Sequence, residues 1–253
     1  MLSSRRSFLA RLGQATGLVA LAGCDRLSSS PWFTRLLDTA EPVTRAVQRT
    51  VAPSAATVRE YTAADLSPVF PVNGTANPDN DEYQAWAAAG FAGWRLRVGG
   101  LVERPVSLSL DEIRALPART QITRHDCVEG WSAIAKWTGA HLGALLNVAG
   151  LQPAARYVVF HCADPMDALG TRYYESIALD DAYHPQTILA YEMNDRLLPV
   201  AHGAPLRLRL ERQLGYKMAK YVMGLDVVAR LDTIASGRGG YWEDQGYEWY
   251  AGI

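Results

Sequence analysis

The sequence TRHDCVEGWS, residues Thr123–Ser132, places a single cysteine in a polar run that ends in a Gly-Trp-Ser turn. The other cysteines, Cys24 and Cys162, are too distant from Cys127 for a zinc knuckle or a Cys-x-x-Cys redox pair. A lone thiol flanked by His125, Arg124 and the carboxylates of Asp126 and Glu129 has two chemical uses, as a nucleophile or as a metal ligand. A small buried hydrophobic residue is the structural alternative, although core cysteines seldom lie in so polar a run.

A longer pattern contains this stretch: R-x-x-C-V-E-G-W-S over residues 124–132, W-x-G over 137–139 and L-x-x-L-L over 142–146. The pattern resembles the molybdenum-binding segment of the sulfite oxidase family, and most closely the branch of bacterial periplasmic protein-methionine-sulfoxide reductase catalytic subunits. The likeness extends from about Asn73 to about Val228. It implies that Cys127 is the only protein ligand of molybdenum, which is also bound by the dithiolene sulfurs of one molybdopterin. A soft thiolate suits such a metal, and a single one leaves positions open for substrate.

Composition sets further limits on function. The chain has 253 residues, 49% of them hydrophobic, and a net charge of −1, which is typical of a globular protein without the basic field that nucleic-acid binding requires. Its three cysteines do not form a disulfide framework. No Walker or Gly-x-Gly-x-x-Gly motif appears, so nucleotide binding of those kinds is unsupported.

The N-terminus has the pattern of an export signal. Ser4–Leu9 (SRRSFL) matches the twin-arginine pattern, and the apolar stretch Leu12–Gly23 that follows is too short to span a bilayer. Leu21–Cys24 (LAGC) resembles a bacterial lipobox in which Cys24 becomes the lipidated first residue, the alternative being an ordinary cleaved signal. We therefore interpret residues 1–23 as a twin-arginine lipoprotein signal peptide. The expected location is the periplasm, with a lipid anchor in the inner membrane.

The mature chain divides into a tether and one domain. Residues 24–66 are tether-like in composition and contain one short amphipathic helix, for which Ser30 is the expected N-cap and Pro31 the first residue. Residues 67–253 are expected to form the molybdopterin-binding oxidoreductase domain.

Short alternating or apolar stretches predict strands over residues 94–98, 119–124, 156–162, 173–179, 188–193, 197–200, 206–210 and 221–228. A capping box at Ser109–Glu112 opens a short helix that runs to Leu116, and a second helix spans residues 141–149 before Gly150. Many short strands with few helices favour an α+β fold. The resemblance specifies it as a mixed, β-rich, single-domain sulfite oxidase-type molybdopterin-binding fold.

The resemblance also implies residues that hold the cofactor, Mo-molybdopterin. Asn73, and less strongly Asn77, fall in the Asn-Gly-Pro-rich loop that the family places against the pterin. In the segment HGAPLR, residues 202–207, Arg207 is the expected clamp on the phosphate or pterin. His202 stands where asparagine is usual in relatives, and its imidazole can still donate a hydrogen bond.

A second loop, GYKMAK at residues 215–220, resembles the family's Gly-x-Lys-x-x-Lys loop. The resemblance implies that its backbone and its last lysine face the cofactor. The residues expected to bind the cofactor are Lys217, Met218, Ala219 and Lys220. Cys162 falls where the reductase branch has a threonine beside the cofactor, and a strand-buried thiol is an equal alternative. Arg209 and Arg212 are interpreted as residues of a solvated strand face.

Glu129 and His125, on either side of Cys127, are candidates for proton handling or for tuning the metal, with a purely structural role as the alternative. The resemblance implies two-electron oxygen-atom transfer. Sulfite-oxidising relatives carry an arginine soon after the cysteine, whereas here none appears between Cys127 and Arg156. Reduction of a sulfoxide-like substrate, small or protein-bound, is therefore favoured. The alternatives are sulfite oxidation and a metal-free, lipid-anchored binding protein that kept the fold.

The chain has no Cys-x-x-Cys-His haem motif and no iron–sulfur spacing. A separate haem-containing electron-transfer partner, soluble or membrane-embedded, is therefore expected. The chain ends at Ile253 without the immunoglobulin-like domain through which sulfite oxidases dimerise, so a monomer is expected. The aromatic segment Tyr241–Tyr250 either seals an edge of the core or forms a docking surface for a partner.

Overall fold

The computed structural model describes residues 29–51 and 56–253, and the chain divides into two compact units after Thr50. In the first unit α2 spans Pro31–Asp38, and α3 follows over Ala40–Val51. A helix begins at Pro31 as predicted, but the segment predicted to contain one helix contains two, which meet at Thr39. The predicted signal peptide, residues 1–23, lies outside the described residues and stays a prediction. Within the described ranges, no helix is both long enough and apolar enough to cross a membrane.

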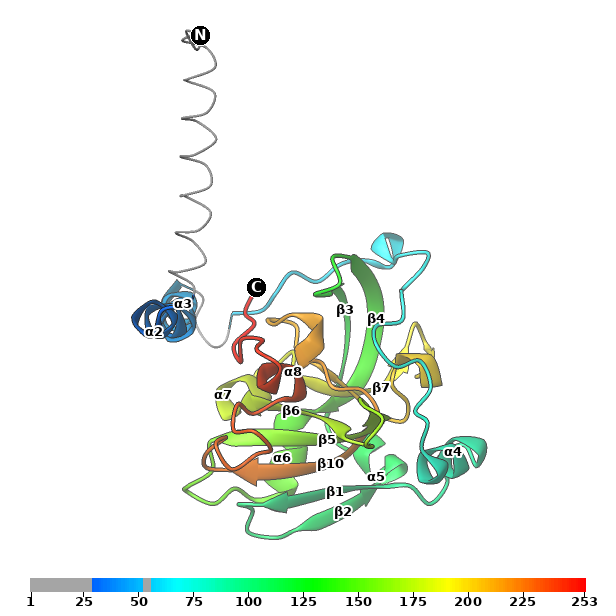
Figure 1. Ribbon diagram of the computed structural model, residues 1–253. Coiled ribbons are helices and arrows are strands. Elements are labelled where there is room, and N and C mark those ends of the chain that lie inside the picture. Colours follow the sequence, from blue (N-terminus) through cyan, green and yellow to red (C-terminus); the bar gives the residue numbers. More distant parts are fainter. Residues whose placement is uncertain (1–28, 52–55) are drawn as a thin grey trace, which may run out of the picture. The chain divides into compact units, whose positions relative to one another are not determined.

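The second unit contains two sheets (Figure 1). The first has the order β2-β1-β10-β5-β6, with β1 and β10 parallel and the other pairs antiparallel; the strands are β1 Arg95–Gly100, β2 Val106–Ser109, β5 Tyr157–Pro165, β6 Arg172–Ala178 and β10 Val222–Val228. The second sheet has the order β3-β4-β7-β8, with β9 also paired to β7; the strands are β3 Ala118–Asp126, β4 Ser132–His141, β7 Ile188–Met193, β8 Arg196–Leu197 and β9 Arg207–Arg209. The mixed, strand-rich α+β prediction is confirmed.

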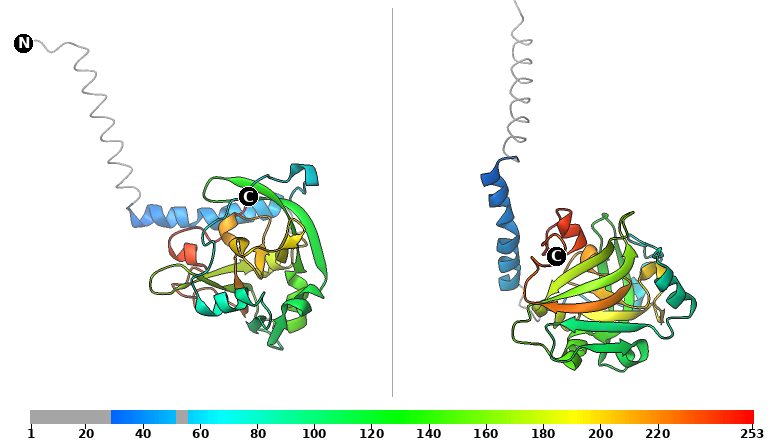
Figure 2. Two further views of the ribbon diagram at one scale, coloured as in Figure 1. Left: turned by 90° about the vertical axis from the view of Figure 1, so that its right-hand side faces the viewer. Right: turned by 60° about the horizontal axis from the view of Figure 1, so that its bottom comes forward.

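The strands of the two sheets run in different directions. In Figure 1, β3 and β4 rise steeply, while β1, β5 and β10 run across the view; Figure 2 shows the first sheet from below. The main core includes Trp94, which directly precedes β1, Phe160 of β5 and Leu208 of β9, all fully or almost fully buried. A smaller core surrounds Trp137 of β4. The buried residues therefore come from both sheets, and β9 carries side chains into the main core.

The remaining helices are short: α4 Asp81–Ala88, α5 Leu110–Arg114, α6 Leu142–Ala149, α7 Leu179–Ala182, α8 Tyr241–Asp244, and the 3₁₀ turns η1 Ala63–Asp65, η2 Val200–His202 and η3 Gly215–Lys217. The predicted capping box is confirmed, because the Ser109 hydroxyl accepts from the amide of Glu112, and the Glu112 carboxylate accepts from the amide of Ser109. Gly150 ends α6 with a φ of +70°, a conformation that favours glycine.

Each predicted strand is found at least in part, but β2, β4, α4, α7 and α8 were not predicted. The buried positions of β4 are Ala133, Ala135, Trp137, Gly139 and Ala140, so four of the five are small residues that carry little hydrophobic signal. Gly139 lets β4 lie close to β7, because a Cβ there would meet the Leu189 carbonyl oxygen at 2.3 Å.

The segment before residue 67 is bound to this unit by its backbone. The amide of Tyr61 donates to the carbonyl of Ile122 in β3 at 2.8 Å, and the amide of Ser67 donates to the carbonyl of Ile134 in β4 at 3.0 Å. The amide of Val58 donates to the Gln186 side chain at 2.8 Å. Hydrogen bonds to the domain thus begin within the segment predicted to be a tether.

Candidate active site

Cys127 directly follows β3, in the turn that joins β3 to β4. Two backbone hydrogen bonds close the turn: the amide of Cys127 donates to the carbonyl of Trp131 at 2.9 Å, and the amide of Gly130 donates to the carbonyl of Cys127 at 3.0 Å. Gly130 has a φ of +89°, which residues with a side chain seldom adopt. The turn therefore holds the thiol at the end of a strand, as predicted.

The Cys127 side chain is 8% exposed and lines a cavity of about 200 Å³. Polar residues from segments that are far apart in the sequence line this cavity: Asn73, Thr75, Glu129, Asp164 and Lys220. Apolar and aromatic side chains complete the lining: Val128, Met166, Tyr173, Tyr216, Met218, Trp242 and Tyr247. The cavity therefore combines one thiol, one cation, two carboxylates and an extensive apolar surface.

Burial raises the pKa of the Cys127 thiol, and the charge of Glu129 raises it further. The amide of Glu129 and the charge of Arg207 act in the opposite direction. Without a metal this thiol is therefore protonated at neutral pH, and it is no activated nucleophile. Coordination to a metal deprotonates a thiol outright, so of the two chemical uses considered, metal ligation is the one that the surroundings favour.

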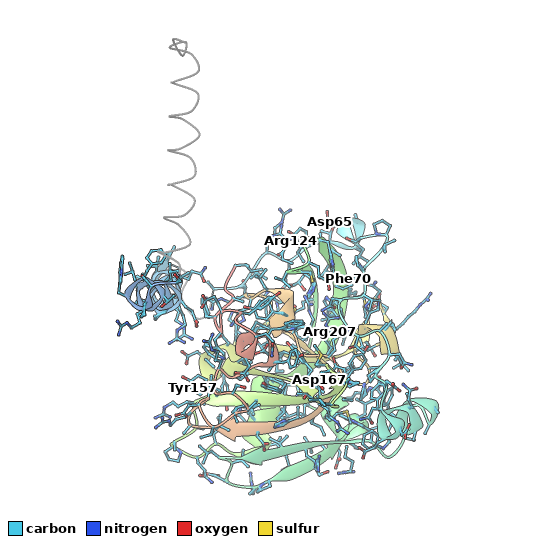
Figure 3. The ribbon with its side chains drawn as sticks, in the orientation of Figure 1. Asp65, Phe70, Arg124, Tyr157, Asp167 and Arg207 are labelled. Carbon is cyan, nitrogen blue, oxygen red and sulfur yellow. The ribbon has the colours of Figure 1, made fainter. Side chains whose placement is uncertain are left out.

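Arg207, at the start of β9, is fully buried and does not itself line the cavity, but it contacts the lining residue Asn73 (Figure 3). Its guanidinium donates to the carbonyl of His202 and to the side-chain oxygen of Asn73, both at 3.2 Å, and lies 5.4 Å from the Trp137 ring centroid. Its Nε has no hydrogen-bond partner among the described residues. Burial, followed by the charge of Arg209, lowers the pKa of Arg207 to about 9, so it remains a cation at neutral pH.

Lys220 is the second buried cation, with only 5% of its surface exposed. Its ammonium donates to the carbonyl oxygens of Asn73, at 2.6 Å, and of Thr75, so its partners are uncharged. Burial lowers the pKa of Lys220 to about 7, and the charge of Arg207 adds to the effect.

Within the described residues, neither Arg207 nor Lys220 forms an ion pair with a carboxylate. Buried charges normally have an ionic partner, because an unpaired one is costly to desolvate. An anion is therefore the complement that these two side chains lack. A molybdopterin phosphate and a Cys127 thiolate supply negative charge, and the Asn73 amide and the free Nε of Arg207 suit a hydrogen-bonding pterin. The residues present fit Mo-molybdopterin.

Lys217 does not take part in this arrangement. Its ammonium is fully buried and pairs with Glu175 at 2.5 Å and with Glu243 at 2.6 Å. The two carboxylates neutralise its side chain, which links β6 to α8. The predicted contact of the loop's backbone with the cofactor stays a prediction. Met218 lines the cavity. Ala219 is buried outside the cavity lining, and its carbonyl accepts from the amide of Leu208 at 2.8 Å.

Three other candidates lie in different surroundings. His202 is half-buried against Phe70, with ring centroids 5.6 Å apart, and burial lowers its pKa to about 4, so it is neutral. Asn77 is exposed and accepts a hydrogen bond from Gln84 at 2.8 Å, so its side chain does not reach the cavity. Cys162 lines a separate cavity of about 950 Å³ beside β1 and β10, and burial raises its pKa strongly.

His125 is fully buried behind the cavity and does not line it. Arg209 donates to its Nδ1 at 3.0 Å, and the sulfur of Met218 is 3.3 Å from the same nitrogen. Burial, and then the charges of Arg207 and Arg209, lower the pKa of His125 well below its usual value. Gly215 is required here, because a Cβ would lie 2.4 Å from the ring. His125 is therefore a neutral supporting residue.

Glu129, the other candidate for proton handling, lines the cavity but is exposed at its edge. Its carboxylate accepts from the Trp131 indole at 2.9 Å.

The expectation that Arg209 lies on a solvated strand face is wrong. It is fully buried, forms an ion pair with Glu211 at 2.7 Å and lies 4.4 Å from the Trp137 ring centroid. Alternation along the strand suggested a solvated face, but both Arg207 and Arg209 point into the interior.

Several residues of the cavity were not predicted from the sequence. Asp164, the penultimate residue of β5, had a detectable signal, since it is a carboxylate at the end of a buried strand. Trp242 and Tyr247 belong to the aromatic segment near the C-terminus, for which only an edge seal or a docking surface was considered. Their rings are 5.4 Å apart, and they line the cavity that contains Cys127.

The sequence matches one family model and is similar to named proteins of other organisms. Residues 84–233 match the model of the oxidoreductase molybdopterin binding domain. A protein of Azospira oryzae, provisionally named protein-methionine-sulfoxide reductase subunit YedZ1, is 39% identical over 251 residues, which cover 99% of this chain and 88% of that protein. The protein-methionine-sulfoxide reductase catalytic subunit MsrP of Xanthomonas axonopodis pv. citri is 38% identical over 151 residues, which are 56% of this chain and 47% of that subunit.

Among solved structures, the sulfane dehydrogenase SoxCD from Paracoccus pantotrophus superimposes with a TM-score of 0.48 at 22% identity, over 54% of this chain and 38% of that chain. A structural match at this TM-score and identity carries no argument about function.

Proposed function

Because the chain belongs to the sulfite oxidase family of molybdopterin-binding oxidoreductases, we propose that it reduces a sulfoxide to a thioether, with the methionine sulfoxide of peptides or proteins as its substrate class. The observation that carries this proposal is the Cys127 thiol in a cavity that also contains an unpaired buried cation and aromatic side chains. The names of the relatives from Azospira and Xanthomonas support the same substrate class.

The residues of this chain divide the work of holding the cofactor. Cys127 is the proposed protein ligand of molybdenum, while Arg207, Lys220 and Asn73 hold the phosphate and the pterin. When bound, Mo-molybdopterin supplies two-electron oxygen-atom transfer. His202 is neutral, so it contributes a hydrogen bond and no charge.

The cavity lining favours a neutral sulfoxide over sulfite. Among its described lining residues, Lys220 is the one cation, and no arginine is present to hold a sulfite anion. Trp242, Tyr247 and Met166 supply apolar surface for a thioether side chain, whose sulfur interacts favourably with aromatic rings at about 5 Å. A methionine sulfoxide side chain has this mixture of one strongly polar bond and an apolar remainder.

The setting of the reaction is also a proposal. The twin-arginine pattern at Ser4–Leu9 and the lipobox-like Leu21–Cys24 support export of the folded, cofactor-loaded protein to the periplasm and a lipid anchor on the inner membrane. Electrons come from a separate haem-containing partner, since the sequence contains no haem or iron–sulfur motif.

The test uses protein produced in a host that makes molybdopterin. Molybdenum and pterin contents are measured first, and then the oxidation of reduced viologen dye with methionine sulfoxide is compared with sulfite-dependent reduction of cytochrome c. Sulfoxide-dependent dye oxidation without sulfite activity supports the proposal. Sulfite activity alone would establish the oxidising alternative, and a protein that binds no molybdenum would establish the metal-free one.

A further inference from the structure

Asp164 is a buried carboxylate that the account so far leaves unused. It lies at the end of β5, is 5% exposed and lines the same cavity as Cys127. Its Oδ1 has no hydrogen-bond partner among the described residues. A buried polar atom without a partner is costly for folding and calls for another explanation. Because Asp164 lines the cavity, a ligand bound in the cavity is the partner to look for.

The proposed reaction consumes protons. Reduction of a sulfoxide to a thioether takes up two electrons and two protons; the S=O bond breaks, and the oxygen leaves as water. The electrons come from a one-electron donor, which is the haem-containing partner in the cell and a reduced dye in the assay. A group that delivers a proton to the leaving oxygen must lie at the cavity, and it must bind a proton near neutral pH.

We propose that Asp164 delivers one of these two protons to the sulfoxide oxygen and then recovers a proton from solvent through the cavity, while the second proton comes from solvent. This inference rests on the proposed sulfoxide reduction. Asp164 suits the role better than Glu129, which is exposed and already accepts from Trp131, and better than His125, which does not reach the cavity. Lys220 also lines the cavity, but it suits proton delivery less well because carbonyl oxygens hold its ammonium.

The surroundings of Asp164 support this role. Burial is the main cause that raises its pKa to about 6, while its own backbone amide and the charge of Lys220 lower it. The other titratable groups that interact with it come from α4, β5, β6 and the residue directly before β10, and all are uncharged at neutral pH: Tyr83, Cys162, Tyr173 and Tyr221. Among the described residues that influence this carboxyl, Lys220 is the one that can carry a charge, and its pKa of about 7 makes that charge partial at neutral pH.

The experiment compares Asp164→Asn with Asp167→Asn. Asp167 lies three residues further along, where its carboxylate accepts from the amides of Leu169 and Thr171 outside the cavity, so it is a matched control (Figure 3). Each enzyme is loaded with cofactor, reduced, freed of excess reductant and mixed with methionine sulfoxide, and the thioether is measured over time in a single turnover. This design separates the chemical step from the supply of electrons.

Asp164→Asn is expected to slow the single turnover roughly 100-fold, with molybdenum content and substrate affinity unchanged. The wild-type rate should fall as the pH rises through about 6, and the variant should lose this inflection. Asp164→Glu should recover part of the rate, and Asp167→Asn should match the wild type. In the cofactor-free protein, infrared difference spectra should assign to Asp164 a protonated carboxyl that disappears as the pH rises through the same range.

Three results would overturn the inference: a wild-type rate and pH profile in Asp164→Asn, a loss of molybdenum in that variant, which would make Asp164 a cofactor-holding residue, or an Asp164 that is fully ionised at pH 5. A wild-type enzyme that reduces no sulfoxide would instead reject the proposed function, so the two failures are distinguishable.

Discussion

Arg207 and Arg209 are both fully buried and two residues apart, yet the structure predicts that replacing each by glutamine changes the free energy of unfolding by different amounts. In the cofactor-free protein, Arg207 has no carboxylate partner, and burial lowers its pKa to about 9. One pKa unit corresponds to about 1.4 kcal/mol, and the pKa falls from 12.5 to about 9, so burying this charge beside Arg209 costs roughly 5 kcal/mol. Arg207→Gln removes that cost together with two charged hydrogen bonds worth about 1.5–3 kcal/mol each. These terms offset each other, and the free energy of unfolding should stay close to that of the wild type.

Arg209→Gln should behave differently, because it leaves Glu211 buried without its ion-pair partner. Breaking a buried pair in this way costs about 3–5 kcal/mol. The assay is urea unfolding of cofactor-free protein, followed by measurement of molybdenum in protein produced with the cofactor. Arg207→Gln should lose roughly ten- to hundredfold in cofactor affinity, from the loss of one charged contact. Equal destabilisation of the two cofactor-free variants, with equal molybdenum contents, would refute the assignment of Arg207 as a cofactor clamp.

Three further predictions follow from the cavity and its supports. Lys217→Met should lower the free energy of unfolding by about 3–5 kcal/mol in urea titrations, because it leaves Glu175 and Glu243 buried and unpaired; a change below 1 kcal/mol would contradict it. Trp242→Ala should raise the KM for methionine sulfoxide and leave kcat nearly unchanged in the dye assay, and an unchanged KM would remove Trp242 from the substrate surface. The pKa of Asp164 is raised from 3.8 to about 6, so its contribution to stability is complete below about pH 3.8 and is lost as the pH rises through about 6. Melting temperatures of cofactor-free Asp164→Asn, measured across this pH range, should lack this loss of roughly 3 kcal/mol. A pH dependence parallel to that of the wild type would refute the prediction.

The sequence predicted much of the fold, because most strands carry the apolar side chains that both sheets bury. It predicted the turn at Cys127 for a local reason, since an alternating strand is followed by Gly130, which tolerates the left-handed backbone. It failed at β4, where alanines occupy inward positions and the hydrophobic alternation is weak. It also failed at Arg209, because alternation does not tell whether the second sheet face is solvated or covered.

The candidate site depended on contacts between residues far apart in sequence. Lys217 and Lys220 look equivalent in the sequence, but the first meets two carboxylates and the second meets only carbonyl oxygens. The position of Asp164 beside Cys127, and of Trp242 over the same cavity, follows from how β5 and the C-terminal segment return to the β3–β4 turn. No local pattern encodes such a return.

The central claim is that the Cys127 thiolate binds molybdenum in this cavity, and X-ray absorption at the molybdenum edge tests it most directly. The wild-type protein should show three sulfur ligands, two from the dithiolene and one from Cys127. Cys127→Ser should show two, with sulfoxide reduction lost and the circular dichroism spectrum unchanged. An unchanged sulfur count together with retained activity in Cys127→Ser would contradict the account.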